Sequence, residues 1–173
     1  MGLYEGIPLT KRGAGYTFVL PDKITLFKHA IATVSRTPEE LFERPEHTFV
    51  GYFIGSPGMN LLEARVEGGR AVVEGCEVAL DGDYGQPSGR VEIGVRPEFA
   101  TLTTGSAGLP VRVRRVEDVG RHKIVRAEFF GSEINVIAGE GDEIGTDMTR
   151  VAFDAERVNV YADDWRVKPE VAA

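Results

Sequence analysis

From residue 61 onwards, the chain consists of short segments in which apolar and polar residues alternate. Glycine and aspartate turns separate these segments, as expected for strands that bury one face and expose the other. So many half-buried strands without a long helical period favour a small closed barrel or a pair of barrels. The predicted strands are 62–66, 71–73, 77–80, 91–95, 111–114, 123–129, 133–137, 150–153 and 157–161.

The stretch before the strands, TPEELFERPEHTFVGYFIGSPGMNLL from Thr37 to Leu62, has a different pattern. Its opening T-x-x-E forms a capping box with proline at the first helical position, which predicts a short helix that begins at Pro38 and ends before Pro45. A second short helix is predicted to follow. Its apolar stripe is expected to pack on the core and consists of Phe49, Val50, Phe53 and Ile54.

Residues 1–36 carry weaker patterns. Segments 16–20 and 24–27 are predicted to form two strands around a turn at 21–23. The glycines at 13 and 15 resemble the end of a phosphate-binding loop, but Tyr16 stands where the lysine of G-x-x-x-x-G-K-[ST] is required. An ordinary glycine-rich turn is therefore the favoured interpretation of this loop.

Three motifs resemble one family in order and spacing. TPEELFERP leading into FVGYFIGSPGMNLL is similar to the junction in ATP-binding subunits of sugar-type ABC importers, where it joins the nucleotide-binding domain to the regulatory TOBE region. Residues 91–99 (VEIGVRPEF) and 116–120 (VEDVG) resemble two further motifs of that region. The resemblance runs from Thr37 to about Ala162.

The resemblance implies a mainly β fold made of OB-like (TOBE or MOP-like) small barrels preceded by a short helical junction. The corresponding boundaries are an uncharacterised N-terminal arm at 1–36, a helical junction at 37–60, an OB-like regulatory β-domain at 61–162 and a C-terminal tail at 163–173.

Composition narrows the function. The net charge is −7 with a pI of about 5.1, which argues against nucleic acid as a partner. A single cysteine, Cys76, has no partner for an internal disulfide, and no apolar run reaches the roughly 20 residues of a membrane span. These features predict a cytoplasmic chain. By resemblance, it would lie at the inner face of the membrane through a transporter complex.

The sequence predicts no enzyme, no cofactor and no metal site. It contains neither the Walker A motif nor an LSGGQ-type signature, so the ATPase chemistry of the longer family members is not expected of this chain. Its three histidines, at 29, 47 and 122, lack ligand spacing. A turn with carboxylates at 140, 142, 143 and 147 admits a cation site but is more typical of solvated surface.

Two groups of side chains are candidates for a role. Arg112, Arg114 and Arg115 are regulatory or anion-binding candidates, with Arg112 and Arg114 expected on one strand face. The alternative is a strand edge that its charges keep soluble.

Arg96, Pro97 and Glu98 form the second group and predict a structural turn, in which Arg96 pairs with a carboxylate.

By resemblance, the chain is a non-catalytic regulatory and dimerisation domain. Its implied partners are a second copy of itself and the membrane subunits or an ATPase subunit of an importer. The alternative is a TOBE-type domain that senses a small molecule or an oxyanion.

Overall fold

The computed structural model describes residues 9–12, 15–18, 42–145 and 149–170. The chain divides into two compact units, Met1–Thr37 and Pro38–Ala173. In the first unit, β1 (Leu9–Arg12) and β2 (Gly15–Phe18) form an antiparallel hairpin. The predicted strand at 16–20 overlaps β2, whereas its expected partner at 24–27 lies outside the described residues.

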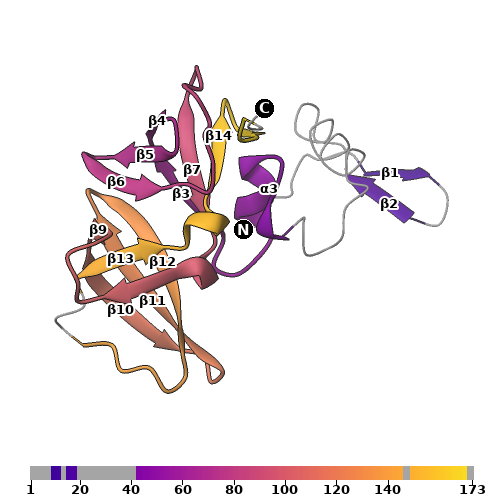
Figure 1. The fold of residues 1–173 in the computed structure, drawn as a ribbon. Helices are drawn as coiled ribbons and strands as arrows, with labels where there is room; N and C mark the ends of the chain where they lie inside the picture. Colours follow the sequence, from indigo (N-terminus) through magenta and orange to yellow (C-terminus); the bar gives the residue numbers. More distant parts are fainter. Residues whose placement is uncertain (1–8, 13–14, 19–41, 146–148, 171–173) are drawn as a thin grey trace. The chain divides into compact units, whose positions relative to one another are not determined.

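The second unit is mainly β and OB-like, with a short helix at its start (Figure 1). We call its strands β3 to β15 the β-domain. One four-stranded sheet has the order β15-β14-β7-β3, and three smaller sheets have the orders β4-β5-β6, β8-β13-β9 and β10-β11-β12, all antiparallel. No helix in the described part of the chain is long and apolar enough to cross a bilayer.

The strands of the first two sheets are β3 (Asn60–Glu63), β4 (Arg65–Glu67), β5 (Arg70–Val73), β6 (Cys76–Ala79), β7 (Val91–Val95), β14 (Asn159–Ala162) and β15 (Trp165–Val167). The strands of the other two are β8 (Ala100–Thr103), β9 (Leu109–Pro110), β10 (Arg112–Asp118), β11 (His122–Phe129), β12 (Ser132–Gly139) and β13 (Arg150–Phe153). Two single-turn 3₁₀ helices, η1 (Pro97–Phe99) and η2 (Ala155–Arg157), precede β8 and β14.

The predicted alternation sets the core. In the β11–β12 hairpin, Val125 faces Val136 and Ala127 faces Ile134, and all four side chains are buried. They join one contiguous apolar cluster that also takes side chains from β3, β7, β13 and β14. The period of two therefore placed the buried face of these strands correctly.

The sequence patterns did not predict four of the described strands: β1, β8, β9 and β15. β8 reads ATLT and lacks a clear apolar alternation. β15 lies in the predicted tail and returns along β14 through a two-residue turn, Asp163–Asp164, in which both residues have positive φ (49° and 72°). Aspartate tolerates this conformation better than most residues, so the A-D-D-W sequence carried a hairpin signal.

The second predicted helix exists as α3 (Thr48–Phe53), but of the expected stripe Phe49, Val50, Phe53 and Ile54 only Val50 is buried. Its buried residues are Thr48, Val50 and Gly51, whereas Phe53 is 69% exposed. A Cβ atom on Gly51 would come within 2.3 Å of Met59 Cε, so the absence of a side chain lets this face of the helix approach the β-domain closely. The first helix ends at Glu43, before Pro45 as predicted, and its predicted start lies outside the described residues.

Strands β3 and β12, which belong to different sheets, are joined by two hydrogen bonds between the Asn60 side chain and the Asn135 backbone. The Asn60 side chain donates to the Asn135 carbonyl at 2.9 Å and accepts from the Asn135 backbone N–H at 2.8 Å. Asn60 is 4% exposed, so both backbone groups of Asn135 are satisfied away from bulk water.

We expect Asn60→Ala to lower the free energy of unfolding by about 1–3 kcal/mol, because it leaves a buried donor and a buried acceptor without partners. Urea denaturation followed by far-UV circular dichroism measures the change. Glu63→Ala, on an exposed position of the same strand, is the control and should stay within about 0.5 kcal/mol of the parent. Equal effects of the two variants would contradict this role of Asn60.

Candidate functional site

Residues 42–59, the junction segment, are held on the β-domain by one buried arginine. Arg96 follows β7 and is 1% exposed. Its Nε donates to the Phe42 carbonyl and its Nη1 to the Gly51 carbonyl, both at 2.8 Å, and Nη1 also donates to the Ile54 carbonyl. The Phe42 ring lies over the guanidinium, 4.2 Å from its carbon to the ring centroid.

Arginine suits this place because both helices of the junction segment end there. The last carbonyls of a helix have no partner within it, and they carry the negative end of the helix dipole. A planar guanidinium with five donors can satisfy carbonyls from two helix ends at once. Burial lowers the pKa of Arg96, an effect that Glu98 opposes.

Among the described residues, Arg96 therefore does not pair with a carboxylate as predicted, and it instead caps the ends of two helices. Pro97 is buried and opens η1, where the missing proline N–H costs nothing, and the Phe99 N–H donates to the Arg96 carbonyl at 3.0 Å. Glu98 is exposed. Local sequence indicated a turn, but the partners of Arg96 lie 42 to 54 residues away.

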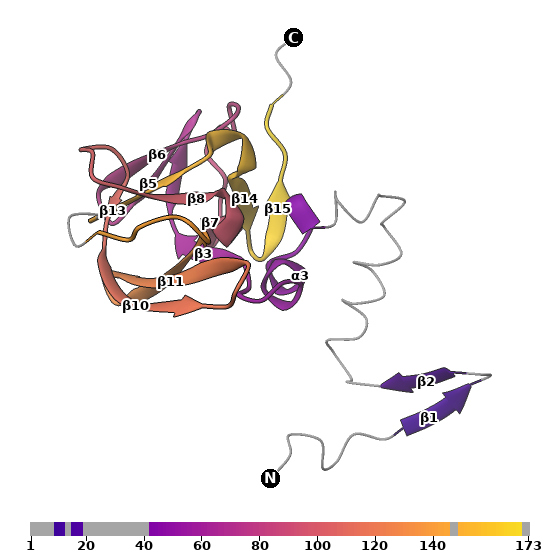
Figure 2. The same ribbon diagram turned by 90° about the horizontal axis from the view of Figure 1, so that it is seen from below.

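Strands β14 and β15 also contact the junction segment. Tyr161, fully buried on β14, donates its hydroxyl to the Pro45 carbonyl at 2.9 Å. Arg166 on β15 pairs with the Glu46 carboxylate at 2.8 Å. Burial raises the pKa of the Tyr161 hydroxyl above its ordinary value, so it stays a donor. Figure 2 shows α3 beside β15.

His47 caps α3. Its Nδ1 accepts the Phe49 N–H at 3.1 Å, and its ring meets Trp165 edge-on with 4.8 Å between the centroids. His47 is 8% exposed. Burial lowers its pKa, and the negative charge of Asp164 opposes that shift. The cap requires an unprotonated Nδ1, so its strength depends on the charge of His47.

The structure separates the three candidate arginines of β10. A bulge between Val113 and Arg115 leaves Arg114 outside the regular register. Arg114 Nε donates to Glu128 at 2.7 Å, and Arg115 Nε lies 3.4 Å from Glu117. Arg112 stands opposite Glu128 in the β10–β11 ladder, and its side chain makes no hydrogen bond or ion pair with the residues that the structure describes.

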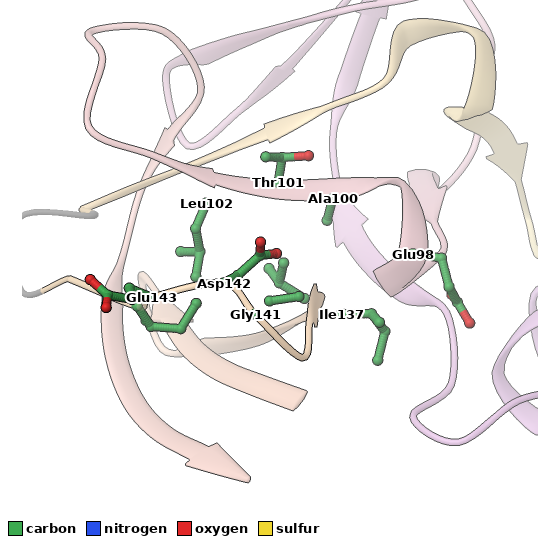
Figure 3. Close-up of a pocket in the computed structure, with 11 residues that line it drawn as sticks. Glu98, Ala100, Thr101, Leu102, Ile137, Gly141, Asp142 and Glu143 are labelled. Carbon is green, nitrogen blue, oxygen red and sulfur yellow. The ribbon is translucent and has the colours of Figure 1, made fainter. Parts of the chain in front are cut away.

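A groove of about 470 Å³ lies between β8 and the end of β12 (Figure 3). Glu98 and Glu143 stand at its two ends, and Leu102 and Ile137 lie between them. The loop after β12 is closed on itself, because Asp142 Oδ2 accepts the Gly139 N–H at 2.7 Å. Within the described residues, no group of three or more histidine, cysteine, aspartate or glutamate side chains could hold a metal ion. Residue 147 of the acidic turn lies outside them.

Two family models match the chain. Residues 55–99 match the MalK OB fold domain, which covers β3 to η1 and includes Arg96. Residues 1–53 match a model described as Zincin-like metallopeptidase. The H-E-x-x-H pattern that places two zinc ligands on a helix does not occur there, since neither His29 nor His47 is followed by glutamate.

Curated relatives agree with the first match. The chain is 31% identical over 152 residues to the sn-glycerol-3-phosphate import ATP-binding protein UgpC 1 of Rhizobium johnstonii, which covers 84% of this chain and 41% of that protein. The UgpC proteins of Vibrio cholerae and Escherichia coli are 33% and 34% identical, covering 66% and 64% of this chain and 31% and 32% of their own lengths. The chain thus spans less than half of these relatives.

We expect Arg96→Met to destabilise the protein by about 3 kcal/mol, because three carbonyls lose their donor while the side chain volume is largely kept. Chemical denaturation measures the loss. The emission of the single tryptophan, Trp165, should report release of the junction segment before the β-domain unfolds. Arg65→Met, at an exposed arginine, is the matched control. Retained stability in Arg96→Met would contradict the capping role.

His47 makes stability depend on pH. Because its pKa in the folded protein lies below the ordinary value of about 6.5, the unfolded chain takes up the proton first as pH falls. The contribution of His47 is therefore complete above that value and is lost as pH decreases below it. Thermal unfolding between pH 5 and 8 tests this over about three units around the ordinary value. His47→Asn keeps a capping oxygen that does not titrate and should remove this pH dependence.

Proposed function

Because the β-domain is homologous to the C-terminal region of the ATP-binding subunits of sugar-type ABC importers, we propose that this chain is a non-catalytic regulatory and dimerisation domain of such a subunit. Its partners are a second copy of itself and the ATPase or membrane subunits of an importer. The chain then works on the cytoplasmic side of the membrane, held there by the complex. The relatives' names suggest import of sn-glycerol 3-phosphate or a related carbohydrate.

The fixation of the junction segment by Arg96 carries this proposal. In the family, this segment links the domain that hydrolyses ATP to the regulatory domain. A regulatory domain transmits force only if the link is rigid where it enters. The three carbonyl contacts of Arg96 and the Tyr161–Pro45 contact supply this rigidity. A movement applied at residue 42 would therefore move the β-domain as one body.

A second candidate function is sensing of a small molecule or an oxyanion by the arginines of β10. Arg112 favours it, because its side chain has no partner among the described residues, whereas Arg114 and Arg115 already have carboxylate partners. Phosphate, sulfate and molybdate titrations followed by thermal shift separate this function from the first, because a ligand that binds only the folded state must raise the melting temperature.

Sedimentation velocity across a concentration series tests dimerisation. We expect a dimer at low micromolar concentration, because we propose that the domain's own surface drives pairing. The companion experiment mixes the purified chain with an importer ATP-binding subunit and follows association by the same method. A monomer at every concentration, together with no association with that subunit, would overturn the proposed function.

A further inference from the structure

A shallow cleft of about 470 Å³ lies where β9, β10 and β13 meet the tip of the β11–β12 hairpin. It is separate from the groove beside β8 and from the junction segment. The cleft is lined by Pro110, Val111, Arg112, Glu128, Phe130, Thr149 and Arg150.

The side chains that line the cleft carry more positive than negative charge, whereas the chain as a whole is negative. The whole chain carries −7, yet Arg112 and Arg150 line this cleft with Glu128 as its single acidic lining residue among those described. Glu128 is already engaged by Arg114, and Arg150 spends one donor, Nη1, on the Gly108 carbonyl at 2.7 Å. Arg112 remains exposed and without a partner among the described residues. The cleft therefore offers a guanidinium fork to an anion.

Phe130 gives the cleft an aromatic wall at a conformational cost. Phe130 and Gly131 form the two-residue turn between β11 and β12, with φ values of 46° and 85°. Asparagine, aspartate or glycine normally fills the first position of such a turn, and a bulky side chain there is an outlier. Phe130 is 70% exposed and touches Phe129 edge-on at 5.0 Å between centroids. Burial in the core thus does not account for the aromatic ring.

We propose that this cleft binds a small anionic ligand whose charged group is carried on an apolar body, as in an aryl phosphate or an aryl carboxylate. Arg112 pairs with the anion, and the Phe130 ring covers the apolar part. A bare oxyanion would use the arginine and leave Phe130 unexplained, because an ion without an apolar body gains nothing from the ring. The inference rests on the sensing function and is independent of the dimerising one.

The test is a titration of the full-length ¹⁵N-labelled chain with phenyl phosphate, followed by two-dimensional NMR. Inorganic phosphate and benzyl alcohol are the separate probes of the charged and apolar halves. We expect saturable shifts of the amides of Arg112, Phe130 and Gly131, with phenyl phosphate binding at least tenfold more tightly than either half.

Two variants and one control locate the site. Arg112→Gln should weaken phenyl phosphate about tenfold, as expected for losing one charge-assisted contact. Phe130→Asn should also weaken it while raising or preserving the melting temperature, because asparagine suits the turn. Arg70→Gln removes an exposed arginine from a distant sheet and should leave binding unchanged.

Each other outcome overturns the assignment. Equal affinity for inorganic phosphate would show a bare oxyanion site, which leaves the sensing function intact but removes the amphiphilic ligand. Shifts confined to other strands would place the ligand elsewhere. Absence of binding by every probe would remove this cleft as a ligand site, whereas the sensing function would still be tested by the oxyanion titrations and the dimerising role by the sedimentation and association measurements.

Discussion

The structure depends on a charge that has no access to water. Arg96 is 1% exposed, and a buried guanidinium is stable only if carbonyls replace its lost hydration. Three carbonyls of the junction segment do so, and the Phe42 ring covers one face of the guanidinium. Its Nη2 has no hydrogen-bond partner among the described residues, so the buried guanidinium depends on the hydrogen bonds of Nε and Nη1. The three carbonyls in turn depend on the hydrogen bonds that Arg96 donates.

The remaining contacts of the junction segment fit this constraint. Gly51 allows α3 to lie close to Met59, which brings the helix end within reach of Arg96. Tyr161, on the strand next to β7, fixes Pro45, and the His47 side chain caps the start of α3. A short helix of this length is not stable by itself in water, so its existence depends on these tertiary contacts. The segment behaves as part of the β-domain rather than as a flexible linker.

The three arginines of edge strand β10 differ in their partners. The bulge in β10 and the ion pairs of Arg114 and Arg115 protect an edge strand against pairing with another chain. Arg112 lies beyond that protection, at the cleft beside Phe130. In β10, therefore, Arg114 and Arg115 pair with carboxylates at the strand edge, whereas Arg112 lines the cleft.

The sequence by itself determined most strands, their buried faces and the resemblance to importer ATP-binding subunits. These features depend on short-range patterns, because a period of two and a turn residue act within a few positions. It also indicated the turn at Arg96, Pro97 and Glu98. Only the tertiary structure decided what Arg96 binds, which face of α3 is buried and which arginines of β10 pair with a carboxylate. Each of these depends on contacts that no local pattern encodes. The Tyr161–Pro45 contact spans 116 residues and that of Arg96 with Phe42 spans 54.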